Sequence, residues 1–420
     1  MTGPATSTMS RLLRRIVSAY GLVGVNGAAQ LASAAVFALS ARALGSGNFG
    51  REATVLSVSV TATSVLELGV NARVVRMLAA GDIDVVRAHA MATGKTFVTS
   101  VGAALVVAVA VVSTQASWWS GVFAVLYAAG MQHSQSMQAI LRAQHRLWAA
   151  VLLVGLDKLV ALSVVGGWAV VGIGATGMWT SLVAGVTCAA FVAAIVLGRT
   201  AVTARVCHPY RGGSAFAVAS VATGLQPLDV ALAGLVAGPG AAGVYAAVSR
   251  WTAPLLLLPV SVGQMEAPKI AAAPSHSAAW RIVSRSGWLV TPTIGIAAVG
   301  VLGAPWLVST VLGAGYAGSV MPLRLLLVGV ATGAMGQLLL VFLQGRGYER
   351  SAARVFSGVV AVQFLAIAGL GHWFGATGVA MAMALANAAV SLLMYAAGRR
   401  HVREARHRER EGEYAPDFVS

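Results

Sequence analysis

The sequence predicts an all-α membrane protein with about 12 transmembrane helices, arranged as two parallel six-helix repeats around a central cavity. Three observations lead to this prediction. Of the 420 residues, 58% are hydrophobic and only 10% are charged, whereas soluble domains are about 45–50% apolar and about 25% charged. Apolar runs of roughly 20 residues, enough to cross about 30 Å of hydrocarbon, recur along the chain. Two short motifs also occur twice at similar spacing.

The repeated motifs indicate an internal duplication. GSGNFGREA at 45–53 and GPGAAGVYA at 238–246 share three glycines and a final alanine, and GATG at 174–177 recurs at 375–378. The first pair is separated by 193 residues and the second by 201. Six spans per half is an even number, so both halves enter the membrane from the same side. The repeats are therefore expected to be parallel, as in an alternating-access transporter.

The predicted spans alternate with short turns and basic loops. They cover about 16–41, 53–77, 91–113, 118–141, 147–170, 175–197, 214–237, 241–265, 283–303, 323–343, 352–370 and 376–397. The expected parts are a cytoplasmic N-terminal tail (1–15), a first six-helix bundle (16–198), a basic cytoplasmic linker (199–213), a second bundle (214–398) and a charged cytoplasmic tail (399–420). The tail is expected to be a solvated helix or disordered.

The net charge of +16 does not indicate nucleic acid in this chain. The basic residues lie between apolar runs and gather on one side of the predicted spans, which places both termini in the cytoplasm by the positive-inside rule. Arginine greatly outnumbers lysine, which is typical of a GC-rich bacterial genome, so we expect a multi-pass protein of the bacterial cytoplasmic (inner) membrane. The two cysteines, Cys188 and Cys207, suggest neither a disulfide nor a metal site.

No pattern in the sequence predicts an enzyme or a cofactor. The GxGxxG spacing of the first glycine motif lies between two predicted membrane helices, whereas a dinucleotide site requires a preceding strand. Its glycines are better interpreted as a tight turn that lets helix backbones approach closely. The sequence has no Walker lysine motif and no HExxH, paired CxxC or GxSxG motif.

Ionisable residues at membrane depth are the main candidates for function. A charge at a helix centre costs at least about 2.5–3.5 kcal/mol, so such residues usually face a bundle interior or a wet cavity. Asp229 near the end of the seventh span and Arg250 in the eighth are both predicted to lie roughly 12–15 Å below the outer surface. They either neutralise each other as a structural pair, or Arg250 binds an anionic headgroup while Asp229 tunes it or takes a coupling cation.

Further candidates line the first half. Glu67 lies deep in the second span and needs a partner, while Arg73 is close enough to the cytoplasmic end to extend its charge to water. Asp157 and Lys158 are adjacent and are expected to point in different directions, which leaves Lys158 as a cavity candidate. Asn26 and Gln30 in the first span are further candidates for the cavity lining.

Two other features of the spans bear on packing and motion. Gln135, Gln138 and Arg142 are spaced to share one face of the fourth span, which is expected to pack inward, and Gln132 and His133 add to that polar stretch. Prolines within predicted spans remove a helical hydrogen bond and bend the helix. The prolines concerned are Pro254, Pro259 and Pro292.

Several segments resemble the polysaccharide-transporter (oligosaccharide, O-antigen-type flippase) family. They are ARALGSGNFG, LELGVNARVVRMLA, PLDVALAGLVAGPGAAGVYAAVSR and PWLVSTVLGAGYAGSVMPLRLLLVG. This family belongs to the multidrug/oligosaccharidyl-lipid/polysaccharide exporter superfamily. The resemblance covers nearly the whole chain and implies two six-helix halves that rock between inward-open and outward-open states.

The resemblance also implies a cargo. It would be a polyprenyl-linked, usually pyrophosphate-linked, oligosaccharide that moves from the inner to the outer leaflet for envelope polysaccharide biosynthesis. Arg250 matches a position where the family often has a basic residue, and Asp229 matches the family's acid in the seventh span. The implied drive is a proton or sodium gradient without ATP. The implied partners are the lipid-linked glycan, membrane lipids and envelope glycan synthesis enzymes.

Two alternative functions remain open at the level of the sequence. The first is a cation-coupled multidrug exporter of the same superfamily, which requires a cavity dominated by acids. The second is a non-transporting membrane scaffold that recruits envelope enzymes through its basic tail. Deletion after Gly398 is expected to abolish the function of a scaffold and to leave a transporter largely intact.

Overall fold

The structure is a computed structural model of the 420-residue chain. It describes residues 5–172, 174–197, 210, 221 and 224–410, and no side chain is described for 5–23 or 408–410. Most of the predicted linker, the first residues of the seventh predicted span, Cys207 and the end of the tail lie outside the described residues.

All the regular elements of the described residues are helices, as the sequence predicts. They are α1 (Ala5–Leu66), α2 (Val70–Ala79), α3 (Val85–Thr114), α4 (Trp118–Ala143), α5 (Leu147–Val171), α6 (Ala175–Leu197), α8 (Leu228–Ser249), α9 (Ala253–Ala271), α10 (His276–Ser286), α11 (Thr291–Val311), α12 (Val320–Gly345) and α13 (Glu349–Arg410). Three short 3₁₀ helices join some of them: η2 (Arg250–Thr252), η3 (Gly287–Val290) and η4 (Ala314–Ser319).

Helices lie at the predicted membrane spans wherever the structure describes the chain. Within the described residues, eight helical stretches are long and apolar enough to cross a membrane. Gly24–Leu66 and Glu349–His407 bend at Gly45 and Gly375, and each is long enough to provide two crossings. Leu228–Ala271 bends at Gly238, close to its start, because the first residues of the seventh predicted span lie outside the described residues. Helix α4 is 26 residues long but more polar, and it lies at the fourth predicted span.

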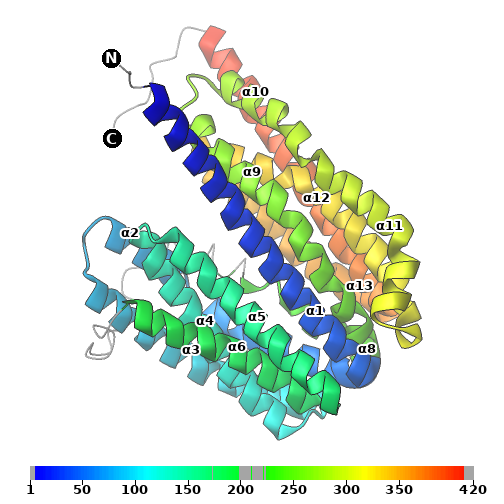
Figure 1. The fold of residues 1–420 in the computed structure, drawn as a ribbon. Helices are drawn as coiled ribbons and strands as arrows, with labels where there is room; N and C mark the ends of the chain where they lie inside the picture. Colours follow the sequence, from blue (N-terminus) through cyan, green and yellow to red (C-terminus); the bar gives the residue numbers. More distant parts are fainter. Residues whose placement is uncertain (1–4, 173, 198–209, 211–220, 222–223, 411–420) are drawn as a thin grey trace. The chain divides into compact units, whose positions relative to one another are not determined.

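The chain forms two compact units. One contains Met1–Arg250 with Val311–Tyr316, and the other contains Trp251–Thr310 with Ala317–Ser420. In the first unit α5 packs on α6 and α3 on α4, side by side in Figure 1, and α1 packs on α8. In the second unit α12 packs on both α9 and α13. These units do not coincide with the predicted bundles, since α8 packs with the first unit; the bundle boundaries stay a prediction.

Each unit has its own apolar core at one end. In the first unit, Val74, Met91, Ile140 and Leu153 are buried together, from α2, α3, α4 and α5. In the second, the buried cluster joins α9, α10, α12 and α13 and includes Phe342, which Trp280 contacts edge-on at 5.2 Å between ring centroids. Many other large apolar side chains are exposed, among them Leu105, Val109 and Leu302, as expected for helices that face hydrocarbon.

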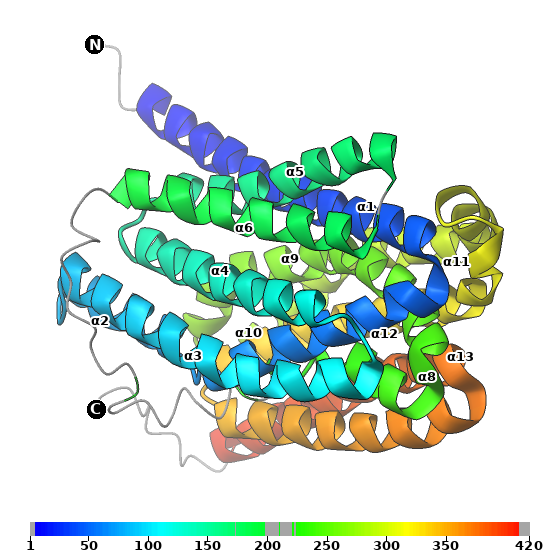
Figure 2. The same ribbon diagram turned by 90° about the horizontal axis from the view of Figure 1, so that it is seen from below.

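The two glycine motifs form sharp bends rather than loops. Helical structure continues on both sides, and the darker and lighter blue segments of α1 meet at such a bend in Figure 2. Gly45 has φ 72° and ψ 163°, and Gly238 has φ 84° and ψ 168°. These dihedrals are nearly identical and favour glycine, because a side chain is strained at positive φ. The duplication predicted from the sequence is therefore repeated in the backbone.

The two bends also contact each other reciprocally within the first unit. A Cβ added to Gly50 would overlap the Pro239 carbonyl and lie 2.8 Å from the Gly243 nitrogen. A Cβ added to Gly243 would overlap the Ser46 carbonyl and lie 3.0 Å from the Gly50 nitrogen. Gly50 and Gly243 occupy equivalent positions of the repeat, so the contact has the symmetry of the duplication and holds α1 against α8.

The regular α-helix is interrupted after Arg250, close to two of the predicted prolines. The α-helical pattern changes to the 3₁₀ turn η2 there, and Pro254 lies in the first turn of α9, where its missing N–H costs little. Pro259 stays inside α9. Pro292 is the second residue of α11, directly after η3, so it begins a helix instead of bending the middle of one.

The charged tail is more ordered than the sequence suggests. After its bend at Gly375, helix α13 continues to Arg410, and Val402 and Ala405 are buried at 5% and 7% exposure. Arg406 Nε donates to Ser277 Oγ at the start of α10, at 2.8 Å. The segment from 399 to 410 is a packed extension of the last helix, because its apolar residues continue the buried face of α13.

The paired bends give a first testable prediction. Gly50→Ala and Gly243→Ala place a methyl group against a backbone carbonyl, and overpacking of this kind costs about 1–3 kcal/mol or more. Each variant is expected to unfold at a lower temperature in detergent than the parent chain. Gly47→Ala and Gly240→Ala are matched controls from the same motifs, since nothing lies within 4 Å of either added Cβ. Equal effects at all four positions would show that the reciprocal contact does not stabilise the fold.

Candidate functional site

The acid of the seventh span is held by a tyrosine. Asp229 lies in the first turn of α8 and is 9% exposed, and its Oδ2 accepts a hydrogen bond of 2.6 Å from the Tyr245 hydroxyl. Its Oδ1 accepts the Val230 amide at 2.8 Å. Asp229 and Tyr245 lie on opposite sides of the Gly238 bend, so the bond ties the two arms of α8 together.

The first repeat uses a different polar tie at the equivalent position. Glu52 occupies the place of Tyr245, and its Oε2 accepts a 2.7 Å hydrogen bond from Trp179 Nε1 of α6. Glu52 is 6% exposed and Trp179 is 1% exposed. The backbone of the two repeats is alike, but their buried acids have different partners, which gives the second repeat a carboxylate close to Arg250.

Arg250 is not directly paired with Asp229. Its guanidinium carbon lies 5.2 Å from the centroid of the Phe37 ring on α1, a cation–π contact. No carboxylate within the described part of the chain lies within 4.0 Å of this guanidinium, although its charge acts on Asp229 from a greater distance. Asp229 and Arg250 therefore form no direct ion pair, and Tyr245 donates to the carboxylate; whether the two residues act as a structural pair or as a substrate site stays a prediction.

Lys158 forms an ion pair with its own neighbour. Its Nζ lies 2.6 Å from Asp157 Oδ2, and both side chains are largely buried. The expectation that adjacent residues point apart is wrong here, because the long lysine side chain folds back onto the carboxylate and an isolated charge at this depth is costly. Gly185 of α6 leaves room for this pair, since a Cβ there would lie 2.7 Å from Asp157 Oδ1.

Glu67 ends the first part of the second span and caps the next helix. Leu68 and Gly69 both have positive φ, and they separate α1 from α2. The Glu67 carboxylate accepts the Gly69 amide at 3.2 Å and the Asn71 amide at 2.7 Å. A carboxylate at a helix N-terminus satisfies free amides and the helix dipole. The predicted partner of Glu67 thus includes the backbone of a broken membrane helix.

Tyr210 in the linker is attached to the same break. Its hydroxyl donates to the Leu66 carbonyl at 2.9 Å. Burial raises the pKa of Tyr210 to about 12, with a smaller contribution from the Glu67 charge. The hydroxyl therefore stays protonated at physiological pH and remains a donor at the end of α1.

A fully buried lysine lies beside this helix break. Lys95 Nζ donates to Asn71 Oδ1 at 3.0 Å, to Gln132 Oε1 at 3.0 Å and to the Gln132 carbonyl at 3.3 Å. Ser136 Oγ donates to the same Asn71 oxygen at 3.0 Å. The lysine lies on α3 and is 0% exposed, and the oxygens around its ammonium group come from α2 and α4. We call Glu67, Asn71, Lys95, Gln132 and Ser136 the inner polar cluster.

The inner polar cluster replaces the face predicted for α4. The buried side chains on this helix are those of Gln132 and Ser136, which are 1% and 3% exposed. Gln135 and Gln138 are only partly buried, and Gln138 donates to Ser134 Oγ at 3.3 Å. Arg142 is exposed. The inward face is rotated from the prediction because the buried ammonium group draws the oxygens of Gln132 toward it.

The remaining predicted site residues are partly buried. Asn26 and Gln30 lie on α1 with no side-chain hydrogen bond to another described residue, and Arg73 lies on α2. The structure brings neither amide to the inner polar cluster. Their proposed role in lining a cavity stays a prediction.

Sequence reasoning missed Lys95 and Asn71. Lys95 seemed to belong to the start of the third span, but α3 begins at Val85, so the lysine lies about 15 Å along the helix. The sequence feature that indicates Lys95 is Glu67, because a deep acid needs a compensating base and Lys95 is the lysine of the neighbouring apolar run. Tyr245 was also missed. The sequence feature that could have identified it is its position in the second copy of the repeated glycine motif.

The geometry favours binding over covalent chemistry. Among the described residues, no group of three or more His, Cys, Asp or Glu side chains is placed to hold a metal ion. The acids at membrane depth that were named above already accept hydrogen bonds or an ion pair. Arg250 is a cation at membrane depth whose described partner is an aromatic ring, and this arrangement suits an anionic ligand.

Solved structures with a similar fold are transporters of the MATE family. An inward-facing multidrug resistance MATE family transporter of the MOP superfamily aligns over 90% of this chain and 96% of its own, with a TM-score of 0.70 and 15% identity. An outward-facing multidrug resistance MATE family transporter aligns over 93% of this chain and 95% of its own, with a TM-score of 0.60 and 15% identity. The Vibrio cholerae MATE transporter VcmN in the bent form aligns over 92% of this chain and 97% of its own, with a TM-score of 0.59 and 13% identity.

These likenesses establish the fold. The chain has the MATE fold of twelve transmembrane helices in two repeats, which confirms the fold class predicted from the sequence. No protein-family model and no curated protein matches the chain by sequence. The finer resemblance to polysaccharide flippases therefore stays an expectation.

The inner polar cluster gives the second prediction. Lys95→Met keeps the length of the side chain but removes the donor to Asn71 and Gln132. Ser136 still donates to Asn71 Oδ1 and to the Gln132 carbonyl, so Gln132 Oε1 is the acceptor that loses its donor. One buried acceptor left unsatisfied costs about 1–3 kcal/mol, so the variant is expected to unfold about 1–3 kcal/mol more easily. Arg76→Met is the control, since Arg76 on α2 is exposed and surface changes usually stay within about 0.5 kcal/mol. Equal unfolding free energies for both variants, measured by titration with a denaturing detergent, would contradict this account.

Proposed function

We propose that the protein is a transporter that moves a polyprenyl-linked oligosaccharide from the inner to the outer leaflet of a bacterial cytoplasmic membrane. The MATE fold supports a transporter, because its described relatives are transporters in inward-facing and outward-facing conformations. The proposal includes alternating access of two halves, termini in the cytoplasm and coupling to a proton or sodium gradient.

The single observation that carries the cargo class is the state of Arg250. Hydrocarbon gives a charged side chain no solvation, so a membrane-depth guanidinium without a carboxylate partner has unused capacity for an anion. Arginine also binds phosphate through several parallel N–H bonds. The Phe37 ring beneath it orients the guanidinium without neutralising it. A pyrophosphate-linked glycan supplies the anionic group that this arrangement lacks.

The partners of the buried acids argue against a cationic drug as cargo. The described relatives include multidrug transporters, and this makes drug export the second candidate. A cationic drug needs an available carboxylate, but Asp229 is bound by Tyr245, Asp157 by Lys158 and Glu67 by the amides of Gly69 and Asn71. Anionic cargo therefore agrees better with the described side chains.

The packing of the tail changes the test that separates a membrane scaffold from a transporter. Val402 and Ala405 pack into the second unit, so deletion after Gly398 removes buried surface as well as charge. That deletion no longer separates a scaffold from a transporter. Substitution of exposed arginines of the tail is the cleaner comparison, because it leaves the packed face intact.

The proposal is tested by the sidedness of the lipid-linked glycan in cells depleted of the protein. Intact spheroplasts are treated with an impermeant glycan-modifying enzyme, and the modified fraction of the lipid-linked intermediate is measured. The expected result is that the intermediate accumulates and becomes inaccessible from outside. An unchanged pool with unchanged accessibility would rule out the flippase and leave drug efflux to be measured.

Complementation with Arg250 variants provides the third prediction. Arg250→Ala removes the charge-assisted bonds to phosphate, each worth about 1.5–3 kcal/mol, so the accessible fraction is expected to fall at least about tenfold. Arg250→Lys keeps the charge and is expected to retain part of the activity. Arg285→Ala on α10 is the matched control, because Arg285 is exposed. The membrane abundance of each variant is measured in parallel, and loss of Arg250→Ala protein from the membrane would assign this residue a structural role.

A further inference from the structure

The extension of α13 carries a rigid basic face. Two turns beyond the last predicted span, the helix is fixed by the buried Val402 and Ala405 and by the bond from Arg406 to Ser277. The exposed side of the same segment forms a shallow pocket of about 480 Å³, lined by Tyr395, Ala396, Arg399, Arg400, Arg403 and Glu404. The basic side chains of this pocket therefore project from an ordered backbone.

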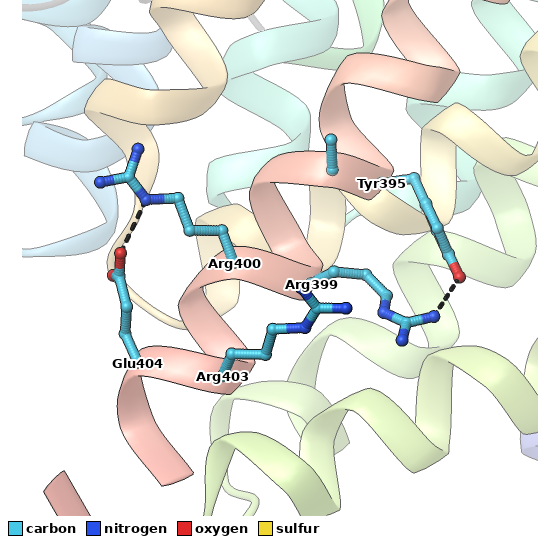
Figure 3. Close-up of a pocket in the computed structure, with 6 residues that line it drawn as sticks. Tyr395, Arg399, Arg400, Arg403 and Glu404 are labelled. Atoms are coloured by element: carbon cyan, nitrogen blue, oxygen red, sulfur yellow. Dashed lines mark hydrogen bonds and ion pairs between the residues drawn. The ribbon is translucent and has the colours of Figure 1, made fainter. Parts of the chain in front are cut away.

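The charges of the pocket are divided between two sides of the helix. In Figure 3, Arg399 and Arg403 extend toward the side of Tyr395, whereas Arg400 and Glu404 extend the other way. The acid is occupied by Arg400, whose Nε lies 2.7 Å from its carboxylate. The side with Tyr395 thus carries two guanidinium groups and no acid of the pocket.

Tyr395 orients the first of these two arginines. Arg399 NH1 donates to the Tyr395 hydroxyl at 2.8 Å, and the guanidinium carbon lies 5.6 Å from the ring centroid. Arg403 makes no side-chain hydrogen bond or ion pair to any residue in the described part of the chain. Two like charges four residues apart repel each other on a helix, and an anion between Arg399 and Arg403 relieves this repulsion.

The basic side continues a lipid-facing apolar stripe. Residues seven apart lie within about 20° of each other around a helix, so Leu385, Leu392 and Arg399 share one face. Leu392 is 69% exposed and Leu385 is 58% exposed, as expected for side chains in contact with hydrocarbon. They lie roughly 10 and 21 Å from Arg399 along the helix, which is within the depth that a lipid acyl chain reaches.

We propose that Arg399, Arg403 and Tyr395 form a binding site for an anionic phospholipid of the leaflet that faces the C-terminus. The phosphate lies between the two guanidinium groups, and the acyl chains lie along Leu392 and Leu385. Arginine forms strong charge-assisted hydrogen bonds with phosphate, and tyrosine is enriched at the level of the lipid headgroups. The combination of a charged end and an apolar stripe on one helix face selects a lipid over a soluble anion or an acidic peptide. This site is independent of the transported cargo.

The test measures binding of dioctanoyl phosphatidylglycerol to the purified full-length chain in a neutral detergent at about 150 mM salt. Dioctanoyl phosphatidylcholine is the headgroup control. The double variant Arg399→Gln with Arg403→Gln is expected to lower the affinity for phosphatidylglycerol about 30-fold, which corresponds to about 1 kcal/mol for each arginine. The thermal unfolding of the double variant is measured in parallel. Arg403→Gln alone is the second variant, because this side chain makes no hydrogen bond or ion pair to the described residues and its loss should leave the fold unchanged.

A matched control exists on the same helix. Arg350 and Arg354 are also exposed and also four residues apart in α13, so Arg350→Gln with Arg354→Gln removes the same charge. This variant is expected to change the affinity less than about threefold. Equal losses in the two double variants would show diffuse attraction by the net charge and would overturn the site. Equal binding of phosphatidylcholine, or full competition by glycerol 3-phosphate at the same concentration, would overturn the phospholipid as its ligand.

Discussion

Hydrocarbon offers neither water nor counter-ions, so every charge placed in a membrane span must be satisfied by the protein or by its ligand. This constraint determines the polar contacts of the first unit. Glu67 accepts amides at a helix break, Asp157 forms an ion pair with Lys158, and Asp229 accepts a hydrogen bond from Tyr245. Lys95 is held by oxygens from two neighbouring helices. Arg250, with an aromatic ring as its described partner, is the exception on which the proposed function rests.

The duplication supplies the frame on which these contacts are placed. Gly45 and Gly238 bend the chain with the same dihedrals, and Gly50 and Gly243 let the two bends touch without side chains between them. The repeats have diverged at Glu52 and Tyr245, which occupy equivalent positions but bind Trp179 and Asp229. The two repeats share their backbone geometry but differ in their polar partners. In the first repeat Glu52 ties α1 to α6 through Trp179, whereas in the second repeat Tyr245 holds Asp229 near Arg250.

The fold was predictable because it depends on long-range averages along the chain. Apolar spans and repeated glycines can be recognised without knowing any contact, and the fold class that they predict is confirmed by the likeness to the MATE fold. The side-chain partners were not predictable in this way. Sequence spacing suggested that Asp157 and Lys158 diverge, whereas the lysine side chain is long enough to fold back. Lys95 was missed because its depth depends on where α3 begins, and the order of 399–410 was missed because Val402 and Ala405 form a short apolar pattern among many charges.

The most direct test of this account compares two ligands of opposite charge. Purified protein is titrated with a polyprenyl pyrophosphate and, separately, with a cationic dye, and the affinity of each is measured for the parent chain and for Arg250→Gln. The account predicts that the parent chain binds the pyrophosphate, that Arg250→Gln weakens this binding at least about tenfold, and that the dye binds weakly to both. Tight binding of the dye, together with pyrophosphate binding that does not depend on Arg250, would contradict it.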